Sequence, residues 1–387
     1  MQAPASPAEL FPKKANRAVA ILRRYVLREL LKPFLISLLF FTFVFLVGNL
    51  FKMVDLLINK GVSPWDLFKI LLFLIPGLLS FTVPTSALAA VLLVFGGFAQ
   101  NNEITAMKAS GINVFTIMLP VLLTAFLMSL GLLFLSDQIE SEAQFAYRRE
   151  AKMLLLKKPL AYLEAGKFIK DFQEYIILTQ RIEKNKLYGI TIYQPQERGK
   201  ATRTIMAESG EIISSTDDKT LTVRLYNGTS DEPNPDDPSI FYKLNFKTFE
   251  LPPIHLGKDD PHNKIEKKVR EMRIDEILYN LGYNPAVKND PSTKREYEAA
   301  LHKKISFSFA PFVFTLVGLP LAIISRRGEA TVSFALALGV VAVYYVLFVW
   351  GRAMSVESGL NPFLAMWLPN VFMIGSGMFL MKRVLSV

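Results

Sequence analysis

The sequence contains no cysteine, and six long stretches of its 387 residues contain no charged residue. Without cysteine the chain has no disulfides, thiolate metal sites or cysteine nucleophiles, but the compartment stays undecided. The uncharged stretches hold no carboxylate or ammonium with which an intramembrane hydrolase or a proton-coupled carrier would work. They comprise residues 34–51, 70–99, 112–136, 305–325, 330–351 and 359–381.

The G-x-x-x-x-G-K-[ST] phosphate-binding pattern is also missing, so this sequence supplies no ATPase motif of its own. Its three histidines, His255, His262 and His302, are scattered without metal-ligand spacing. We therefore expect no catalytic residue, no metal and no cofactor, and any energy for transport has to come from a partner.

Each uncharged stretch is long enough to cross a bilayer, which takes about 20 apolar residues in a helix. Buried helices of a soluble protein rarely lack charge over such lengths, so the stretches predict six transmembrane helices. The second stretch is overlong and contains Pro76 and Pro84, which predict kinks. We expect no signal peptide, because roughly thirty polar or amphipathic residues precede the first stretch and no cleavage site follows it.

Lysine and arginine outnumber aspartate and glutamate, 44 against 34, giving a net charge of +10. The surplus collects at the ends of the predicted spans, which favours a membrane surface and no nucleic acid. By the positive-inside rule, both termini are predicted to be cytoplasmic. The basic residues that decide this are Lys13, Lys14, Arg17, Arg23, Arg24, Arg28, Lys32, Arg326, Arg327, Lys382 and Arg383.

The region between the third and fourth spans is polar and rich in short β-branched runs, which predict strands separated by turns. A sandwich, jelly roll or open barrel would result. The expected strands are residues 175–178, 187–193, 203–206, 211–213, 221–225 and 241–249. The expected turns are Asp217-Asp218, Asn227-Gly228 and the acidic, proline-rich residues 231–238.

Helical periodicity follows over residues 264–281 and 294–304, with residues 282–292 as the linker. Before the first span, Arg24, Arg28 and Lys32 recur every fourth residue, as in an amphipathic helix lying among lipid headgroups. The chain thus divides into residues 1–136 with this helix and spans one to three, 137–304 with an all-β domain and helical stem, and 305–387 with spans four to six.

The loop between spans two and three reads as a complete short helix from Asn101 to Gly111. Asn101 or Asn102 would cap it, Glu103 suits its first turn, and Gly111 would end it. A helix of about two turns is too short to persist alone, so it has to dock against something. A soluble partner is the natural candidate; the alternative is a plain solvated loop.

Three segments carry a resemblance to a known family. They are Arg24-Tyr25-Val26-Leu27-Arg28-Glu29, Glu103-Ile104-Thr105-Ala106-Met107-Lys108-Ala109-Ser110-Gly111, and Leu301-His302-Lys303-Lys304 leading into Pro311 and Pro320. With the domain inserted after the third span, they make nearly the whole chain resemble the lipopolysaccharide export permeases, the LptF/LptG family. The second segment is the most specific.

The resemblance implies an inner-membrane, multi-pass subunit with a periplasmic β-jelly-roll domain. It implies that the short helix is a coupling helix, with Glu103, Ile104, Met107, Lys108 and Gly111 meeting a cytoplasmic ATPase dimer (LptB-like). Further implied partners are a second permease of the same family, as homodimer or heterodimer, a single-span periplasmic protein (LptC-like) and a periplasmic bridge protein (LptA-like). F-type and G-type membership both stay open.

The substrate has a separate argument from charge. Lys52, Lys60 and Arg352 lie at the outer ends of spans, where cations pair with phosphates of an anionic lipid such as lipopolysaccharide; ordinary interfacial anchoring is the alternative. In the β-domain, the alternating residues 187–193 would line a trough for acyl chains. We expect a permease subunit that extracts the lipid and passes it to the periplasmic bridge. A membrane-anchored scaffold or sensor without transport is the competing hypothesis.

Overall fold

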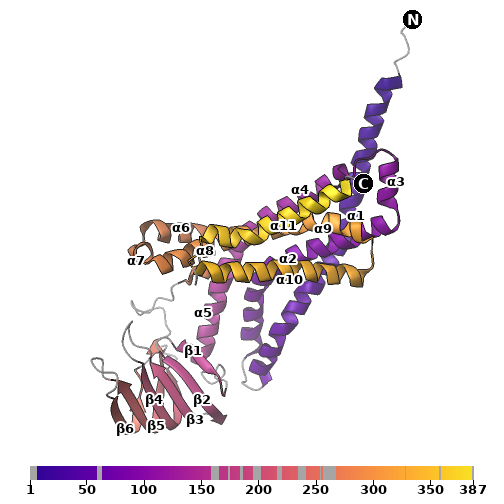
Figure 1. Ribbon diagram of the computed structural model, residues 1–387. Helices are drawn as coiled ribbons and strands as arrows, with labels where there is room; N and C mark the ends of the chain where they lie inside the picture. The colour runs from indigo at the N-terminus through magenta and orange to yellow at the C-terminus, as the bar shows by residue number, and fades with distance from the viewer. Residues whose placement is uncertain are drawn as a thin grey trace. The chain divides into compact units, whose positions relative to one another are not determined.

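A computed structural model of the chain describes residues 7–58, 63–157, 165–172, 175–183, 186–194, 202–215, 220–233, 241–252, 254–255, 267–326, 328–356 and 359–385. The chain forms two compact units (Figure 1). One is helical and comprises Met1–Asn49, Leu74–Phe145 and Lys267–Val387. The other comprises Leu50–Phe73 and Ala146–Glu266 and contains the β-sheet.

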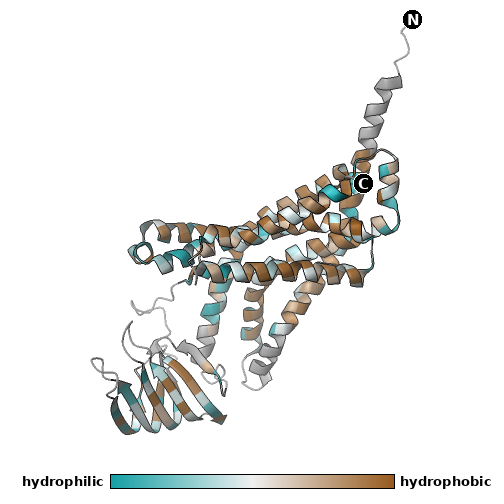
Figure 2. Cartoon of the chain, viewed as in Figure 1, coloured by the Kyte–Doolittle hydropathy of each residue, from teal (hydrophilic) through white to brown (hydrophobic). Residues whose placement is uncertain are grey.

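Long apolar helices correspond to the predicted spans, and Figure 2 shows hydrophobic residues running along them. Among the described residues, five helices are long and apolar enough to cross a membrane, or six if a bent pair is counted as one span. The five lie in α1 Pro7–Ile58, in α2 Pro64–Gln100, in α4 Val114–Phe134 with its continuation into α5 Ser141–Lys157, in α10 Ala330–Val356 and in α11 Pro362–Leu385, and the bent pair is α8 Pro291–Ser308 with α9 Ala310–Ser325.

The bent pair is the predicted fourth span, which breaks between α8 and α9 with an angle of 43°. The sequence predicted one continuous stretch. Pro311 explains the break, because proline has no N–H and its ring clashes with the carbonyl one turn earlier. Neighbouring helices hydrogen-bond to the backbone on both sides of the break: the Asn370 side chain donates to the Ser306 carbonyl at 2.8 Å, and the Phe312 N–H donates to Ser129 Oγ at 3.2 Å.

The core of the helical unit is formed by α2, α4, α9 and α11, with Phe95, Ile117 and Phe314 almost fully buried. Small residues let the helices approach closely. A Cβ at Gly351 on α10 would lie 2.4 Å from the carbonyl oxygen of Ala365 on α11. Close packing of this kind is how helices associate inside a bilayer, where lipid supplies no hydrophobic driving force between them.

The β-unit is built around an antiparallel sheet whose strands pair in chain order, β1 to β6, with β7 paired to β5. Ile177, Ile192, Ile205 and Val223 are fully buried in its core. Because the described strands form one sheet in consecutive order, the jelly roll stays a prediction. The strands are β1 Phe168–Phe172, β2 Tyr175–Glu183, β3 Lys186–Gln194, β4 Arg203–Ser215, β5 Thr220–Pro233, β6 Phe241–Glu250 and β7 Ile254–His255.

The predicted turn at Asn227-Gly228 is wrong, because both residues lie inside β5. Asn227 has φ 50° and Gly189 on β3 has φ 61°, so the left-handed conformation that suits a hairpin serves here within the strands. The alternation of buried and exposed side chains in β3 shifts by one residue at Gly189. Leu187 is buried before Gly189, and Ile190 and Ile192 are buried after it. Such an irregularity re-aims side chains and bends a sheet.

Several strand boundaries also differ from the prediction. Residues 203–206 and 211–213 belong to one strand, β4, and β1 and β7 were not predicted. The acidic segment 231–238 was predicted as a turn, but β5 extends through Pro233. Asp217-Asp218 and residues 234–238 lie outside the described residues.

The stem after the sheet is divided differently from the prediction: within the predicted helix 264–281 the α-helix begins only at Ile274, and residues 264–266 lie outside the described residues. A short 3₁₀ turn (Val269–Glu271) precedes α6 (Ile274–Tyr283), and α7 (Pro285–Asn289) occupies the predicted linker. Asn284 explains α7, since its side chain accepts a hydrogen bond from the Ala286 N–H and proline follows at the first helical position. Asp290 caps α8 likewise, and the hydrogen bonds from Thr293 and Ser292 lower the pKa of its carboxyl.

Candidate functional site

The predicted short helix is confirmed as α3, Glu103–Ala109, at the end of the helical unit that holds the C-terminus (Figure 1). Gly111 ends it with φ 75°. The Gly111 N–H donates to the Lys108 carbonyl at 2.9 Å, and the Ile112 N–H donates to the Met107 carbonyl at 3.0 Å. This is the Schellman arrangement of a glycine-terminated helix. The predicted asparagine cap is wrong: Asn102 occupies the position in a left-handed conformation, and its side chain makes no capping hydrogen bond.

One face of α3 is fixed to the chain's own helices. Ile104 and Met107 are 4% and 8% exposed and belong to the core of the helical unit. Lys108 Nζ donates to the carbonyl of Val384, in the last turn of α11, at 2.9 Å. Three of the five residues predicted to meet a partner therefore hold α3 in place inside this chain.

The other face of α3 is open. Glu103 is half-buried, whereas Thr105, Ala106 and Ala109 are exposed, as is Gly111 beyond the helix. Small side chains with one carboxylate at the edge form a surface against which another protein could lie closely. Of the predicted coupling residues, the structure leaves Glu103 and Gly111 available for such a contact.

A second polar site lies at the opposite end of the helical unit, where the third span ends in a short π-helix, Leu135–Glu140. Lys304 on α8 reaches this π-helix. Its Nζ donates to Ser141 Oγ and to the Met272 carbonyl, both at 2.7 Å, and lies 3.4 Å from Asp137 Oδ1. The Lys304 and Asp137 side chains are 9% and 15% exposed. π-Helical turns often mark functional sites, and this one supplies a buried ion pair.

The neighbouring Lys303 lies in a field of mixed charge. Arg352, Arg270 and Lys304 repel its ammonium, and Glu140 attracts it. Glu140 is itself held in place, accepting a hydrogen bond from Ser80 Oγ at 2.6 Å and another from the Gln144 side chain at 2.7 Å. A half-buried lysine with two arginines nearby is a suitable setting for an anionic group.

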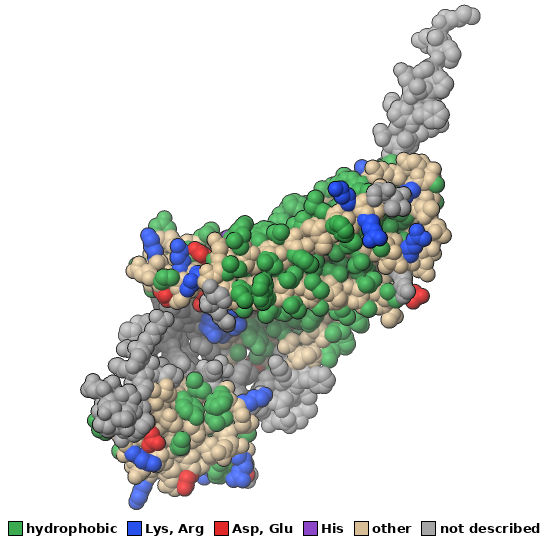
Figure 3. Space-filling view, viewed as in Figure 1, with side chains coloured by type: hydrophobic (Ala, Val, Ile, Leu, Met, Phe, Trp, Pro, Cys, Tyr) green, Lys and Arg blue, Asp and Glu red, His purple; other side chains and the backbone are tan. Residues whose placement is uncertain are grey.

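Lys303, Lys304, Arg270, Arg352 and Glu140 form a charged cluster. Of the three predicted headgroup residues, this cluster contains Arg352, whose side chain is exposed on α10. Lys60 and the side chain of Lys52 lie outside the described residues. Figure 3 shows hydrophobic side chains over the middle of the helical unit and lysine and arginine toward both of its ends, the distribution of a membrane-spanning body.

In the sequence, position 137 is only the start of the predicted middle domain, and Lys303 and Lys304 are only part of a segment that resembles the family. The sequence analysis did not pair them, because residues more than 160 positions apart give no local signal. The sequence does offer one hint, because two consecutive lysines directly precede the uncharged stretch 305–325. A charged residue at the edge of a membrane span usually has a partner of opposite charge, so an acidic partner could have been expected.

Comparisons with known proteins agree with this picture. A family model described as "Lipopolysaccharide export system permease LptF/LptG" matches residues 24–383. The chain is 21% identical over 361 residues to "Lipopolysaccharide export system permease protein LptF" of Escherichia coli K12, covering 91% of this chain and 92% of that protein. It is also 20% identical over 191 residues to "Uncharacterized protein RP871" of Rickettsia prowazekii, covering 49% and 52%.

Proposed function

The chain belongs to the LptF/LptG family of lipopolysaccharide export permeases, and we propose that it is the membrane subunit of an ATP-driven exporter. In this role it takes lipopolysaccharide, or a related anionic glycolipid, out of the inner membrane and passes it to a periplasmic bridge of β-rich proteins. The energy comes from a separate cytoplasmic ATPase dimer that docks on α3. Both chain termini lie in the cytoplasm, and the β-unit lies in the periplasm.

The observation that carries this proposal is the two-faced packing of α3. A solvated loop has no need of two buried side chains and a lysine tether to α11. A helix that transmits motion has to be fixed to the membrane helices and open to a partner at once. Glu103, at the edge of the open face, is the residue through which we expect the ATPase to be engaged.

The charged cluster at the other end of the helical unit supports the anionic substrate. Lys303 and Arg352 offer two cations to a lipid phosphate, and charge-assisted hydrogen bonds contribute about 1.5–3 kcal/mol each. Lys52 and Lys60 stay proposed headgroup-binding residues on the sequence argument alone. The glycolipid acyl chains then pass to the β-unit, where residues 187–193 of β3 would form one wall of a trough.

One chain would form half of the exporter. A second permease of the family, identical or different, completes the cavity, and a single-span periplasmic protein and a bridge protein continue the path. The E. coli relative carries the name of an export system permease, which fits membership of such an assembly.

The test is Glu103→Ala in the purified complex reconstituted with lipopolysaccharide. Lipid-stimulated ATP hydrolysis and lipid release are expected to fall at least tenfold, with assembly unchanged. Glu296→Ala is the matched control, since Glu296 is an exposed glutamate on α8 at the other end of the unit. Full lipid release by the Glu103→Ala complex would contradict coupling through α3. If neither the unmodified complex nor its variants release lipid, the result would favour the scaffold hypothesis.

A further inference from the structure

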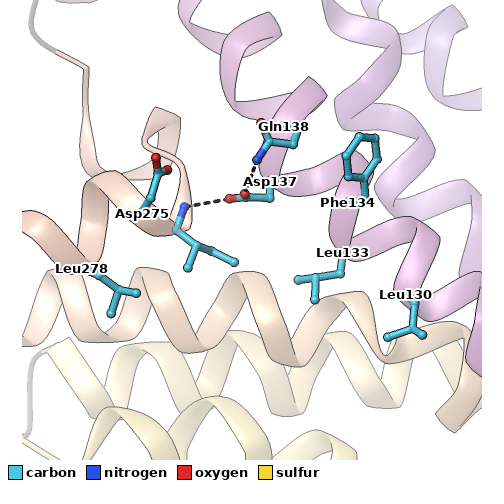
Figure 4. Close-up of a pocket in the computed structure, with 8 residues that line it drawn as sticks. Leu130, Leu133, Phe134, Asp137, Gln138, Asp275 and Leu278 are labelled. Carbon is cyan, nitrogen blue, oxygen red and sulfur yellow. Dashed lines mark hydrogen bonds between the residues drawn. The ribbon is translucent and has the colours of Figure 1, made fainter.

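The helical unit carries an apolar groove of about 560 Å³ between the end of the third span and α6 (Figure 4). Leu130, Leu133 and Phe134 of α4 form one wall, and Ile274 and Leu278 of α6 form the other. The groove is open, because Phe134 and Leu278 are 64% and 52% exposed. It lies at the other end of α4 from α3, and Asp137, the ion-pair partner of Lys304, is among its lining residues.

The groove continues a stripe of apolar side chains along α4. Leu123, Leu127, Leu130 and Phe134 follow one another at helical spacing and are 55%, 66%, 43% and 64% exposed. On a helix that crosses a membrane, such a stripe faces acyl chains, since α4 is the apolar part of a candidate span. An acyl chain lying along this stripe therefore reaches the groove without leaving apolar surroundings.

The far wall places the groove at the level of lipid headgroups. Tyr279 and Tyr283 on α6 are 65% and 76% exposed, and their ring centroids lie 5.3 Å apart with the rings tilted by 32°. Ile277, on the other side of α6, is buried against the stem. Exposed tyrosines on an amphipathic helix are typical of the membrane–water interface, where their rings sit among headgroups.

The polar lining of the groove consists of Asp137, Gln138 and Asp275, and a cation, Arg273, adjoins it as the ion-pair partner of Asp275. The Arg273 side chain donates to both oxygens of Asp275, at 3.1 and 2.6 Å, and the two side chains are 35% and 63% exposed. The hydrogen bond from Arg273 also lowers the pKa of the Asp275 carboxyl, so this carboxylate stays ionised at neutral pH. Asp137 is occupied within the protein as well, accepting hydrogen bonds from the Ile274 N–H and the Gln138 side chain (Figure 4) and lying 3.4 Å from Lys304 Nζ. Asp275 is the more exposed of the two carboxylates, at 63% against 15%.

We propose that this groove binds one phospholipid with a zwitterionic headgroup, phosphatidylethanolamine being the chemical type. An acyl chain lies against Leu130, Phe134 and Leu278. The phosphate pairs with Arg273, and the ammonium pairs with the Asp275 carboxylate. A headgroup with both charges matches an exposed Arg–Asp pair better than a purely anionic one, which Asp275 repels. The proposed ligand is a resident membrane phospholipid and not the transported glycolipid.

The test is photocrosslinking of the full chain in nanodiscs made of equal parts phosphatidylethanolamine and phosphatidylglycerol, with no glycolipid. A photoreactive residue replaces Leu278, and mass spectrometry identifies the lipid attached. Phosphatidylethanolamine should exceed phosphatidylglycerol by about two- to fivefold, the range that partly exposed ion pairs produce. The matched control is the same probe at Leu127, farther along the stripe, where the two lipids should label equally.

Two further variants separate specific from bulk lipid. Asp275→Asn should reduce the enrichment at the Leu278 probe, and Arg273→Gln with Asp275→Asn should abolish it, without changing labelling at Leu127. Gel filtration of each variant verifies folding. Equal labelling by both lipids at Leu278 would show ordinary bulk lipid and overturn the site. Crosslinks to a protein, or no lipid crosslink at Leu278, would overturn it as well.

Discussion

The ion pair between Lys304 and Asp137 should be one of the strongest individual contributions to the stability of the helical unit. Lys304→Met keeps the length of the side chain but removes its charge and its three polar contacts. Removing one partner of a buried pair typically costs about 3–5 kcal/mol. We expect the lower end, about 3 kcal/mol, because Asp137 keeps the hydrogen bonds from the Ile274 N–H and the Gln138 side chain.

The assay is reversible unfolding of the purified chain in mixed micelles with rising dodecyl sulfate, followed by tryptophan fluorescence. A double-mutant cycle with Asp137→Asn should give a coupling energy of about 1–3 kcal/mol, as contacting pairs do. Lys294→Met is the control, since its pair with Glu298 spans 3.8 Å with side chains 50% and 34% exposed, and it should cost under about 0.5 kcal/mol. Equal losses for Lys304→Met and Lys294→Met would refute the reasoning.

Four further predictions follow from the same structure. Met107→Ala should reduce lipid-stimulated ATPase activity as Glu103→Ala does, but with faster amide exchange in α3, because deleting a buried methionine side chain costs about 2–5 kcal/mol. Gly228→Val should expose the β-unit to limited proteolysis, since a Cβ there would lie 2.2 Å from the Met206 carbonyl oxygen. A cysteine at Asn227 should react with an impermeant thiol reagent in intact spheroplasts, and one at Thr105 should not; the reverse would overturn the topology. Arg352→Glu should weaken glycolipid crosslinking within the complex about tenfold or more, whereas Arg352→Lys should largely preserve it.

The helices were predictable because lipid imposes a strong constraint on sequence. A bilayer tolerates no charge over about 20 residues, so each span is visible in the composition alone. The sequence analysis did not predict the break in the fourth span, although Pro311 lies within that stretch. Proline inside an apolar stretch is compatible with a kink or with a clean break, and Ser129 and Asn370 on other helices decide which occurs.

The β-unit was predicted less well, for a different reason. Asn-Gly is the strongest short hairpin signal, because both residues adopt positive φ readily. The same property serves an irregularity inside a long strand, and nothing local separates the two uses. Only the pairing of β5 with β4 and β6 on both sides of Asn227 distinguishes them.

The short helix α3 illustrates what a sequence motif cannot predict about a site. The string from Glu103 to Gly111 identified the helix and its ends, but it carried no information about which side chains face inward. Spacing alone cannot supply this, because a helix of seven residues has buried and exposed sides that only its neighbours define. The structure assigns Ile104, Met107 and Lys108 to the inner side. Substitutions on the inner side and at Glu103 should therefore both stop transport, but for different reasons. A substitution on the inner side releases α3 from the membrane helices, whereas a substitution at Glu103 removes its contact with the partner.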